Sequence, residues 1–253
     1  MGSFVEALER APSNLYAQER QEVVSGLVSR AGRDLIAVLG APSLGCLEHG
    51  ANIMRMLVEI EVYLRWMATQ DLGIYKQFQE YGAGKAKLYA QIFDELPDHV
   101  RTAGFRESIE ELRRLSRNDN PLDLRTVDTR DTFAEGKSIR AMAQDGGLLD
   151  FYRHAYSISS GVAHSEWWSI EKHAMERCYN VLHGMHLIPS LSINPGSDVE
   201  LARAWVDQFY ALMRDGLEIL RTDESAVARA FSWLDADRSP ATAEAPDGDS
   251  GPT

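Results

Sequence analysis

The sequence predicts an all-α fold, a multi-helix bundle, and three observations support this. Apolar residues recur at helical spacing through nearly every segment of the 253-residue chain. No run of alternating β-branched residues indicates a strand. The composition, 44% hydrophobic and 25% charged, is typical of a globular protein with a sizeable core. Together these features favour one helical domain over residues 1–236.

The first half of the chain is divided into expected helices by proline, glycine and capping residues. Ser13 and Ser43 are suitable N-caps, and Pro97 can end one helix and begin the next. Gly82 and Gly84 are weak points inside a helical pattern. The helices expected in this half cover residues 4–10, 13–39, 43–70, 74–96 and 97–117.

The second half begins with a polar, irregular segment, residues 118–136. It is the longest internal loop candidate, and loops beyond about 12–15 residues tend to be functional or mobile. Helices are then expected over residues 137–144, 148–163, 169–187, 198–221 and 223–234. The composition of residues 237–253 predicts a disordered C-terminal tail.

Charge and cysteine content limit the classes of function. The formal net charge of −12 argues against a general electrostatic grip on nucleic acid, which needs a basic surface. Cys46 and Cys178 lie far apart and lack Cys-x-x-Cys spacing, so they indicate neither a disulfide framework nor a zinc site. The N-terminus lacks an apolar signal segment, and no apolar run approaches about 18 residues. We therefore expect a cytoplasmic protein that does not bind membranes.

The segment from Phe151 to Trp168 is the most informative part of the chain. Read as a helix, it carries an apolar stripe at positions i, i+4, i+7 and i+11, formed by Phe151, Ala155, Ile158 and Val162. A polar stripe at the same spacing lies about half a turn away. It contains Arg153, Ser157, Ser160 and His164. If that side faces another helix it is a polar cluster that needs partners, and if it faces water it is an ordinary solvated face.

The helix expected over residues 43–70 is the central one, because it is apolar nearly all round. It contains two i,i+4 pairs of opposite charge, Arg55–Glu59 and Glu61–Arg65. These are either surface ion pairs, each contributing about 0.3–0.5 kcal/mol, or at least one is buried and positions something. We expect Arg55, Glu59, Ser160 and His164 to meet between the two helices.

The same residues carry a resemblance to a family. Arg55-x-x-x-Glu59, followed by Leu64-Arg65-Trp66, resembles the first of two boxes in a widespread bacterial family of unknown function. The second box of that family is an aromatic-rich helix that ends in Ser-x-x-x-His, here Tyr152 and Tyr156 followed by Ser160 and His164. Residues 139–143 and Gly146-Gly147 also fit. The resemblance covers about residues 43–172 and implies a helical fold and a polar cluster without naming an activity.

A more distant similarity is to the HEPN group of helical domains, several of which are metal-independent RNases of toxin and defence systems. Their hallmark is Arg-x(4–6)-His on one helix, and Arg177 to His183 has that spacing. In such enzymes the histidine acts as acid or base and the arginine stabilises phosphate charge. The candidate catalytic residues are His164, Arg153 and Ser160, with Arg177 and His183 as the alternative pair.

Other kinds of chemistry find less support. Di-iron bundles need Glu-x-x-His, and the sequence contains no such motif. His183-x-x-His186 is a lone pair of histidines. We therefore expect neither a metal nor a cofactor. Ser160 with His164 lacks the Gly-x-Ser-x-Gly elbow of hydrolases. Trp167 could stack on a ligand or fix the helix end to the core, and Tyr156 is either a binding or a core residue.

Two functions of different class follow from the sequence. The first is a non-catalytic helical protein that recognises a protein or small-molecule partner, or forms a homodimer, in bacterial stress or defence. Its candidate binding residues are Arg55, Glu59, Glu61, Tyr156 and Trp167. The second is a HEPN-like, metal-independent RNase, which is the only reading with RNA as the partner. We favour the first, because no motif exceeds its chance frequency by much.

Overall fold

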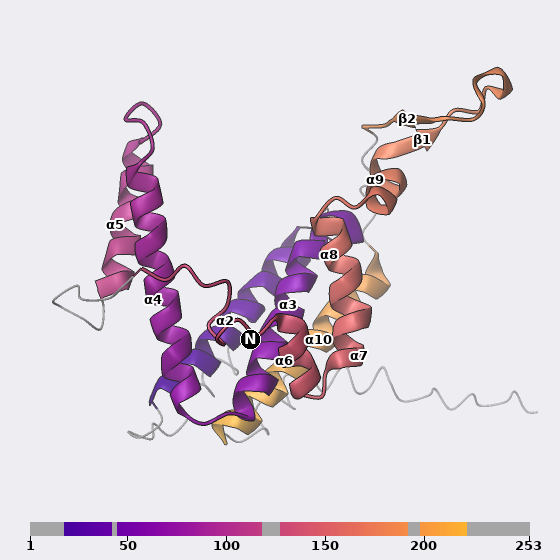
Figure 1. Cartoon of the computed structure of the whole chain (residues 1–253). Coiled ribbons are helices and arrows are strands. Elements are labelled where there is room, and N and C mark those ends of the chain that lie inside the picture. Colours follow the sequence, from indigo (N-terminus) through magenta and orange to yellow (C-terminus); the bar gives the residue numbers. More distant parts are fainter. Residues whose placement is uncertain (1–17, 42–44, 118–126, 192–197, 222–253) are drawn as a thin grey trace, which may run out of the picture.

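The computed structural model describes residues 18–41, 45–117, 127–191 and 198–221, and there it is an all-α bundle with one two-stranded hairpin (Figure 1). The helices expected over residues 4–10 and 223–234, and the tail over 237–253, lie outside the described residues. Within the described part, no helix combines the length and apolarity that crossing a bilayer requires.

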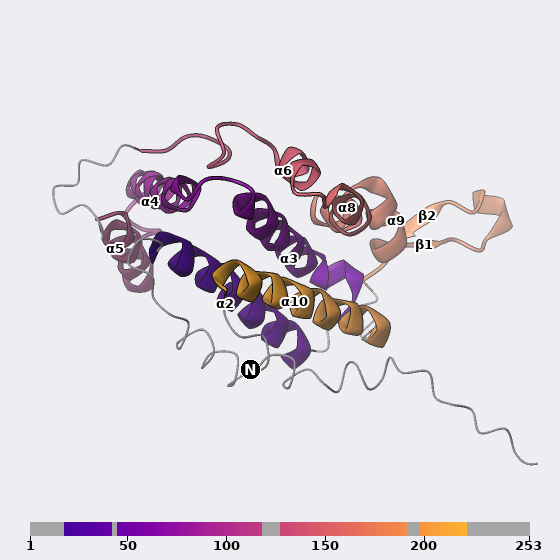
Figure 2. The same ribbon diagram turned by 90° about the horizontal axis from the view of Figure 1, so that it is seen from below.

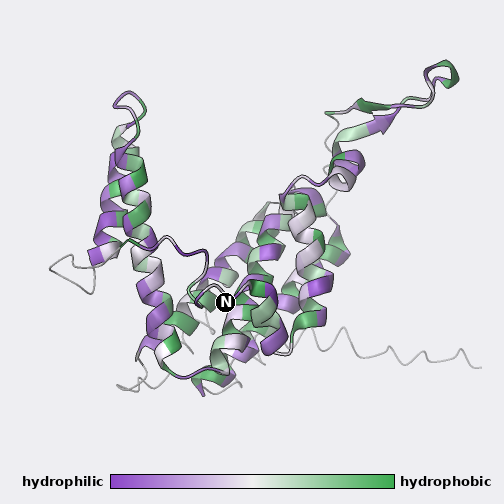
Figure 3. Ribbon diagram, in the orientation of Figure 1, coloured by the Kyte–Doolittle hydropathy of each residue, from purple (hydrophilic) through white to green (hydrophobic). Residues whose placement is uncertain are grey.

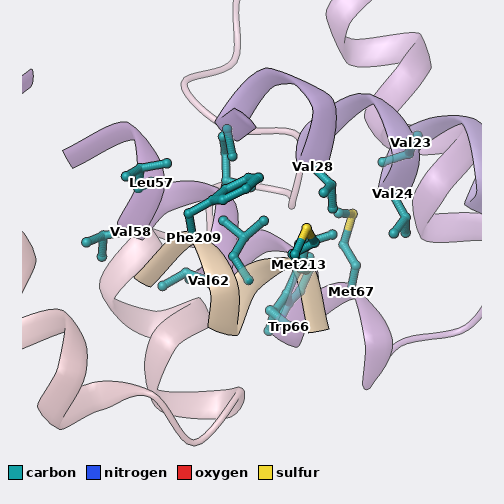
Figure 4. Close-up of a cluster of buried hydrophobic side chains, with 14 of the residues drawn as sticks. Val23, Val24, Val28, Leu57, Val58, Val62, Trp66, Met67, Phe209 and Met213 are labelled. Atoms are coloured by element: carbon teal, nitrogen blue, oxygen red, sulfur yellow. The ribbon is translucent and has the colours of Figure 1, made fainter. Parts of the chain in front are cut away.

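Three long helices form the centre of the bundle: α2 (Gln18–Gly40), α3 (Leu47–Ala68) and α10 (Val199–Leu220) (Figure 2). They bury an apolar core whose side chains include Val24, Val28, Leu57, Phe209 and Met213 (Figure 4). Gly216 lets α10 approach α2 closely, because a Cβ atom there would lie 2.7 Å from Cγ2 of Val28. The pattern of apolar residues correctly predicted all three helices.

A helical hairpin of α4 (Gly73–Asp94) and α5 (Ala103–Arg117) extends from one side of this centre (Figure 1). Gly82 and Gly84 do not interrupt α4. The expectation that Pro97 begins the next helix is wrong. Residues 98–100 form a turn in which the Val100 amide donates to the Pro97 carbonyl, and Thr102 Oγ1 accepts from the Phe105 amide at the start of α5. Thr102 therefore acts as the capping residue.

The part of the expected loop that the structure describes, residues 127–136, contains neither helix nor strand, but its Phe133 side chain is buried. The Phe133 ring makes edge-on contacts with Tyr63, Trp66 and Phe78 at centroid distances of 5.3, 5.8 and 4.8 Å. Gln77 Nε2 donates to the Phe133 carbonyl at 2.8 Å. This aromatic contact attaches the segment to α3 and α4.

After the short helix α6 (Ile139–Asp145), one continuous helical run packs on α3. It consists of α7 (Leu149–Phe151), a π-helical segment η2 (Tyr152–Tyr156) and α8 (Ser157–Ala163). A π turn holds one extra residue, so later side chains are displaced around the axis by roughly a quarter of a turn. For this reason the expected apolar stripe is wrong at Ile158, which is exposed, while Ser159 is buried. Val162 is half-buried, as are Phe151 and Ala155.

The helix expected over residues 169–187 is also wrong. Helix α9 (Trp167–Ala174) ends early, and a β-hairpin of β1 (Met175–Arg177) and β2 (Leu187–Pro189) follows. Its loop contains a single 3-10 turn, η3 (Val181–His183), capped by the Asn180 side chain, and then Gly184 and Met185, both with positive φ. Asn and Gly at these positions favour a turn over a helix. We call residues 175–191 the arm, which projects from the bundle in Figure 1.

Candidate functional site

The structure brings together four polar and aromatic side chains between α3 and the end of α8, which we call the arginine–histidine cluster: Arg55, Glu59, Tyr156 and His164. Arg55 Nε donates to Glu59 Oε1 at 3.0 Å, within one helix. Arg55 Nη1 lies 3.2 Å from His164 Nε2, across two helices. The Arg55 guanidinium also lies 5.1 Å from the centre of the Tyr156 ring, a cation–π distance.

The chemistry of arginine determines the state of His164 in this arrangement. A guanidinium has only donors, so His164 Nε2 must be the acceptor of the 3.2 Å contact. In this contact the ring proton is therefore on Nδ1. The His164 side chain is exposed, whereas Arg55 and Glu59 are half-buried. The cluster therefore presents one imidazole to solvent, backed by an ion pair.

Burial and charge oppose each other at Arg55 and act together at Tyr156. Burial lowers the pKa of Arg55, but the hydrogen bond to Glu59 and the neighbouring Tyr156 raise it by more, so the net pKa is above the ordinary value. Burial raises the pKa of the Tyr156 phenol, and the Glu59 carboxylate raises it again. Tyr156 also stacks on Tyr152 at 4.5 Å. At neutral pH, Arg55 is therefore charged and Tyr156 keeps its proton.

The other candidate catalytic residues lie differently. Ser160 is half-buried one turn before His164, and its carbonyl accepts from the His164 amide at 2.9 Å. Arg153 is exposed, and the guanidinium beside His164 is that of Arg55 instead. Arg153 shares the polar stripe of His164 along the sequence, but the contact forms with Arg55 of α3, as expected for two facing polar stripes.

Glu61, a candidate binding residue, lies in a different group on α3. Glu61 and Asp215 of α10 are both buried, and Arg65 Nε forms ion pairs with both carboxylates, at 3.5 Å to Glu61 Oε1. Burial raises the pKa of Glu61 to about 8, and the hydrogen bond to Asp215 adds to this effect. Two carboxylates that share one arginine in the core favour a protonated Glu61. This group joins α3 to α10 and does not contribute to the arginine–histidine cluster.

The alternative catalytic pair is not brought together. Arg177 lies in β1 and its Nη2 donates to Glu171 Oε1 at 3.3 Å. His183 lies in the loop of the arm, where Nδ1 is 3.7 Å from Cys178 Sγ and Nε2 is 3.2 Å from Asn180 Nδ2. The Arg-x5-His spacing therefore falls on a strand and a turn, and the HEPN hallmark needs one helix. Instead, His183 groups with Cys178 and His186, whose possible ligand atoms all lie within 4.8 Å of one another.

At the base of the arm, two tryptophans take different positions. Trp168 Nε1 donates to Glu166 Oε2 at 2.7 Å, and both side chains lie against Gly161 of α8. Trp167 is 60% exposed. Trp168, although 40% exposed, packs on α8, whereas the Trp167 ring is left largely open to solvent.

The loop and end of the arm expose large apolar side chains, and Figure 3 shows hydrophobic (green) segments at the tip beside hydrophilic (purple) ones. The exposed fractions are 86% for Tyr179, 83% for Val181, 92% for Leu182 and 97% for Leu191. Sequence reasoning missed this surface, because Tyr179, Val181 and Leu182 were assigned to a helix that could bury one face, and Leu191 to the loop after it. The Asn180 and Gly184 turn signals could have indicated the hairpin.

Comparison with known proteins identifies a family without an assigned activity. A family profile described as "Family of unknown function (DUF5677)" matches residues 21–178, more than half of the chain. The match runs from within α2 to the end of β1 and includes both partners of the Arg55–His164 contact. No curated protein and no solved structure matches the chain.

Proposed function

The chain belongs to the DUF5677 family, whose function is unknown, and we propose that it is a non-catalytic helical binding protein that associates with a second copy of itself through the arm. The observation that carries this proposal is the exposure of Tyr179, Val181, Leu182 and Leu191 on one projecting element. Large apolar side chains gathered in this way mark interaction surfaces.

Charge favours a second copy as the occupant. The chain has a net charge of −12, so two copies repel each other over most of their surfaces. The arm is different, because Glu176 and Arg177 are its only fully charged side chains and their opposite charges cancel. It is thus a surface on which two acidic chains can meet without repulsion.

The form of the arm also suits self-association. A two-stranded hairpin has free hydrogen-bonding groups on its outer edges, and such edges readily pair with another strand. Pairing of identical arms around a two-fold axis provides hydrogen-bond partners for the strand edges of both copies at once. Two-fold symmetry is also the commonest symmetry of homo-oligomers. Exposed Ile158 and Trp167 near the base of the arm can receive the apolar tip of the second copy.

The test is the oligomeric state of the full chain, measured by sedimentation equilibrium over a range of concentrations. We expect a dimer for the wild type and at least about tenfold weaker association for Val181→Asp, since a charge is placed in an apolar contact. The matched control is Val100→Asp, the same substitution at an exposed valine in the turn before α5. It should leave the dimer unchanged. A wild type that stays monomeric at high concentration would overturn the proposal.

One observation supports the RNase as a second candidate. His164 is exposed and lies 3.2 Å from Arg55 Nη1, so an imidazole and a guanidinium are adjacent at the surface. In metal-independent cleavage of RNA, an imidazole can transfer protons and a guanidinium can stabilise the charge on the phosphate. The distinguishing experiment incubates the protein with total RNA in EDTA beside His164→Ala and His183→Ala. Cleavage that is lost in His164→Ala and kept in His183→Ala would favour the nuclease. Intact RNA throughout would exclude it.

A further inference from the structure

We propose that the arm holds a zinc-class divalent cation through Cys178, His183 and His186, with a fourth coordination position open to water. The ligand atoms that these three residues offer lie within 4.8 Å of one another. Thiolate and imidazole are the ligands that zinc prefers, and three protein ligands plus water is a known arrangement.

The hairpin register creates the first two ligands of the site. Arg177 pairs with Leu187 at the end of the ladder, so the next opposed pair is Cys178 and His186. The Cys178 amide donates to the His186 carbonyl at 2.8 Å, which fixes this pairing. Opposed residues of an antiparallel pair extend their side chains on the same face, with Cβ atoms about 4.5–5.5 Å apart. Thiol and imidazole are therefore neighbours because of the backbone.

The turn supplies the third ligand. His183 ends the 3-10 turn, and Gly184 and Met185, both with positive φ, reverse the chain there. His183 Nδ1 comes to 3.7 Å from Cys178 Sγ. On a tetrahedral zinc ion, with Zn–S about 2.3 Å and Zn–N about 2.0–2.1 Å, sulfur and nitrogen are separated by about 3.6 Å. The Cys178–His183 edge thus has the length that the ion requires.

Hydrogen bonding prepares His186 as a ligand. Its Nδ1 lies 3.0 Å from the His183 carbonyl oxygen, which can only accept, so Nδ1 carries the proton. The lone pair is then on Nε2. A metal-bound histidine commonly donates its other ring proton to a backbone carbonyl in this way, which orients the ring.

Binding changes two proton positions. The Cys178 thiol loses its proton to solvent, so the affinity should fall at acidic pH. His183 binds through Nδ1 and must then carry a proton on Nε2. Asn180 Nδ2, now 3.2 Å from that nitrogen, gives up its contact. Both changes occur in an exposed loop and leave the helical bundle untouched.

The experiment uses the full chain and Co²⁺ as a spectroscopic substitute for zinc, followed by Zn²⁺ titration calorimetry. We expect one bound Co²⁺ per chain, tetrahedral d–d bands and a thiolate-to-cobalt charge-transfer band. Cys178→Ser should abolish that band, and His183→Ala and His186→Ala should each weaken binding by at least about tenfold. The matched controls, Cys46→Ser and His154→Ala, should behave as the wild type. Absence of the charge-transfer band in the wild type, or its persistence in Cys178→Ser, would overturn the proposal.

A second measurement remains informative if a variant folds poorly. Zn²⁺ should protect Cys178 of the wild type from alkylation, read by peptide mass spectrometry, with Cys46 in the same sample as the internal reference. Protection that disappears in His186→Ala supports the site. Equal alkylation of Cys178 with and without Zn²⁺ contradicts it.

Discussion

Arg55 of α3 and His164 at the end of α8 lie 3.2 Å apart, Nη1 to Nε2, although 109 residues separate them in the chain. The same guanidinium holds Glu59 at 3.0 Å and lies over the Tyr156 ring. Arg55 is therefore the centre of the cluster, and His164 is its solvent-exposed end. Removing Arg55 should therefore cost more stability than removing His164.

We predict that Arg55→Ala destabilises the protein by about 1–2 kcal/mol, because it leaves the half-buried Glu59 carboxylate without its partner. His164→Ala should change the stability by no more than about 0.5 kcal/mol, since the side chain is exposed. Urea unfolding followed by circular dichroism measures both.

The control for the arginine is Arg114→Ala. Arg114 forms an i,i+3 ion pair with Glu111 on α5, and both side chains are more than half exposed. Its loss should therefore cost clearly less stability than the loss of Arg55. Equal losses for Arg55→Ala and Arg114→Ala would show that the cluster is an ordinary surface ion pair.

The raised pKa of Glu61 predicts how the stability of the protein depends on pH. Its pKa is raised from 4.5 to about 8 in the folded protein, so the folded chain binds more protons than the unfolded chain between these values. Stability should therefore be highest below about pH 4.5 as far as this group is concerned, and should decrease as the pH rises toward 8. Glu61→Gln, which stays neutral, should flatten this decrease and be the more stable protein above pH 8.

The measurement is the urea midpoint of both proteins at several pH values across this window. Glu111→Gln is the control, because its hydrogen bond to Arg114 lowers the pKa of Glu111, and that contribution is lost only under acidic conditions. If the wild type and Glu61→Gln lose stability in parallel as the pH rises, Glu61 does not hold the proton.

Sequence and structure agree wherever the helical period is unbroken. Arg55 and Glu59 share one face of α3 at i,i+4, so their pairing could be predicted, and the two polar stripes indicated the contact with His164. The π segment over 152–156 broke the period in the facing helix, and Ser159 rather than Ile158 became buried. Such a segment depends on packing against α3, which one sequence does not reveal.

The arm shows a different limit. Residues 175–187 carry an apolar pattern that fits a helix locally, and the hairpin depends on the turn at Asn180 and Gly184. As long as the segment was read as a helix, Cys178 and His186 lay eight positions apart with no reason to meet. The register of the hairpin makes them opposed residues.

The close packing around Gly161 predicts that a larger residue there would clash at the base of the arm. A Cβ atom there would lie 2.8 Å from Glu166 Oε2 and 2.9 Å from Cζ2 of Trp168, so Gly161→Ala must displace the Trp168 indole. We expect loss of the Trp168–Glu166 hydrogen bond and a destabilisation of about 1 kcal/mol. Tryptophan fluorescence should shift to the red as the ring becomes more exposed.

Gly82→Ala is the matched control, because nothing lies within 4 Å of a Cβ atom at that position in α4. Alanine there should stabilise the helix by up to about 1 kcal/mol. Opposite signs for the two glycine-to-alanine changes are expected. A stabilising Gly161→Ala would mean that Trp168 does not pack on α8.

The burial of Phe133 indicates that the irregular segment 127–136 contributes to the core. Its ring is buried against Tyr63, Trp66 and Phe78, so Phe133→Ala should destabilise the protein by about 3–5 kcal/mol, as expected for a large-to-small change in a packed site. Phe105→Ala is the control: Phe105 contacts Phe93 at 5.0 Å in the projecting α4–α5 hairpin and is only half-buried. Its loss should be clearly smaller. Urea unfolding measures both, and a Phe133→Ala cost below that of Phe105→Ala would mean that the segment is not anchored by this ring.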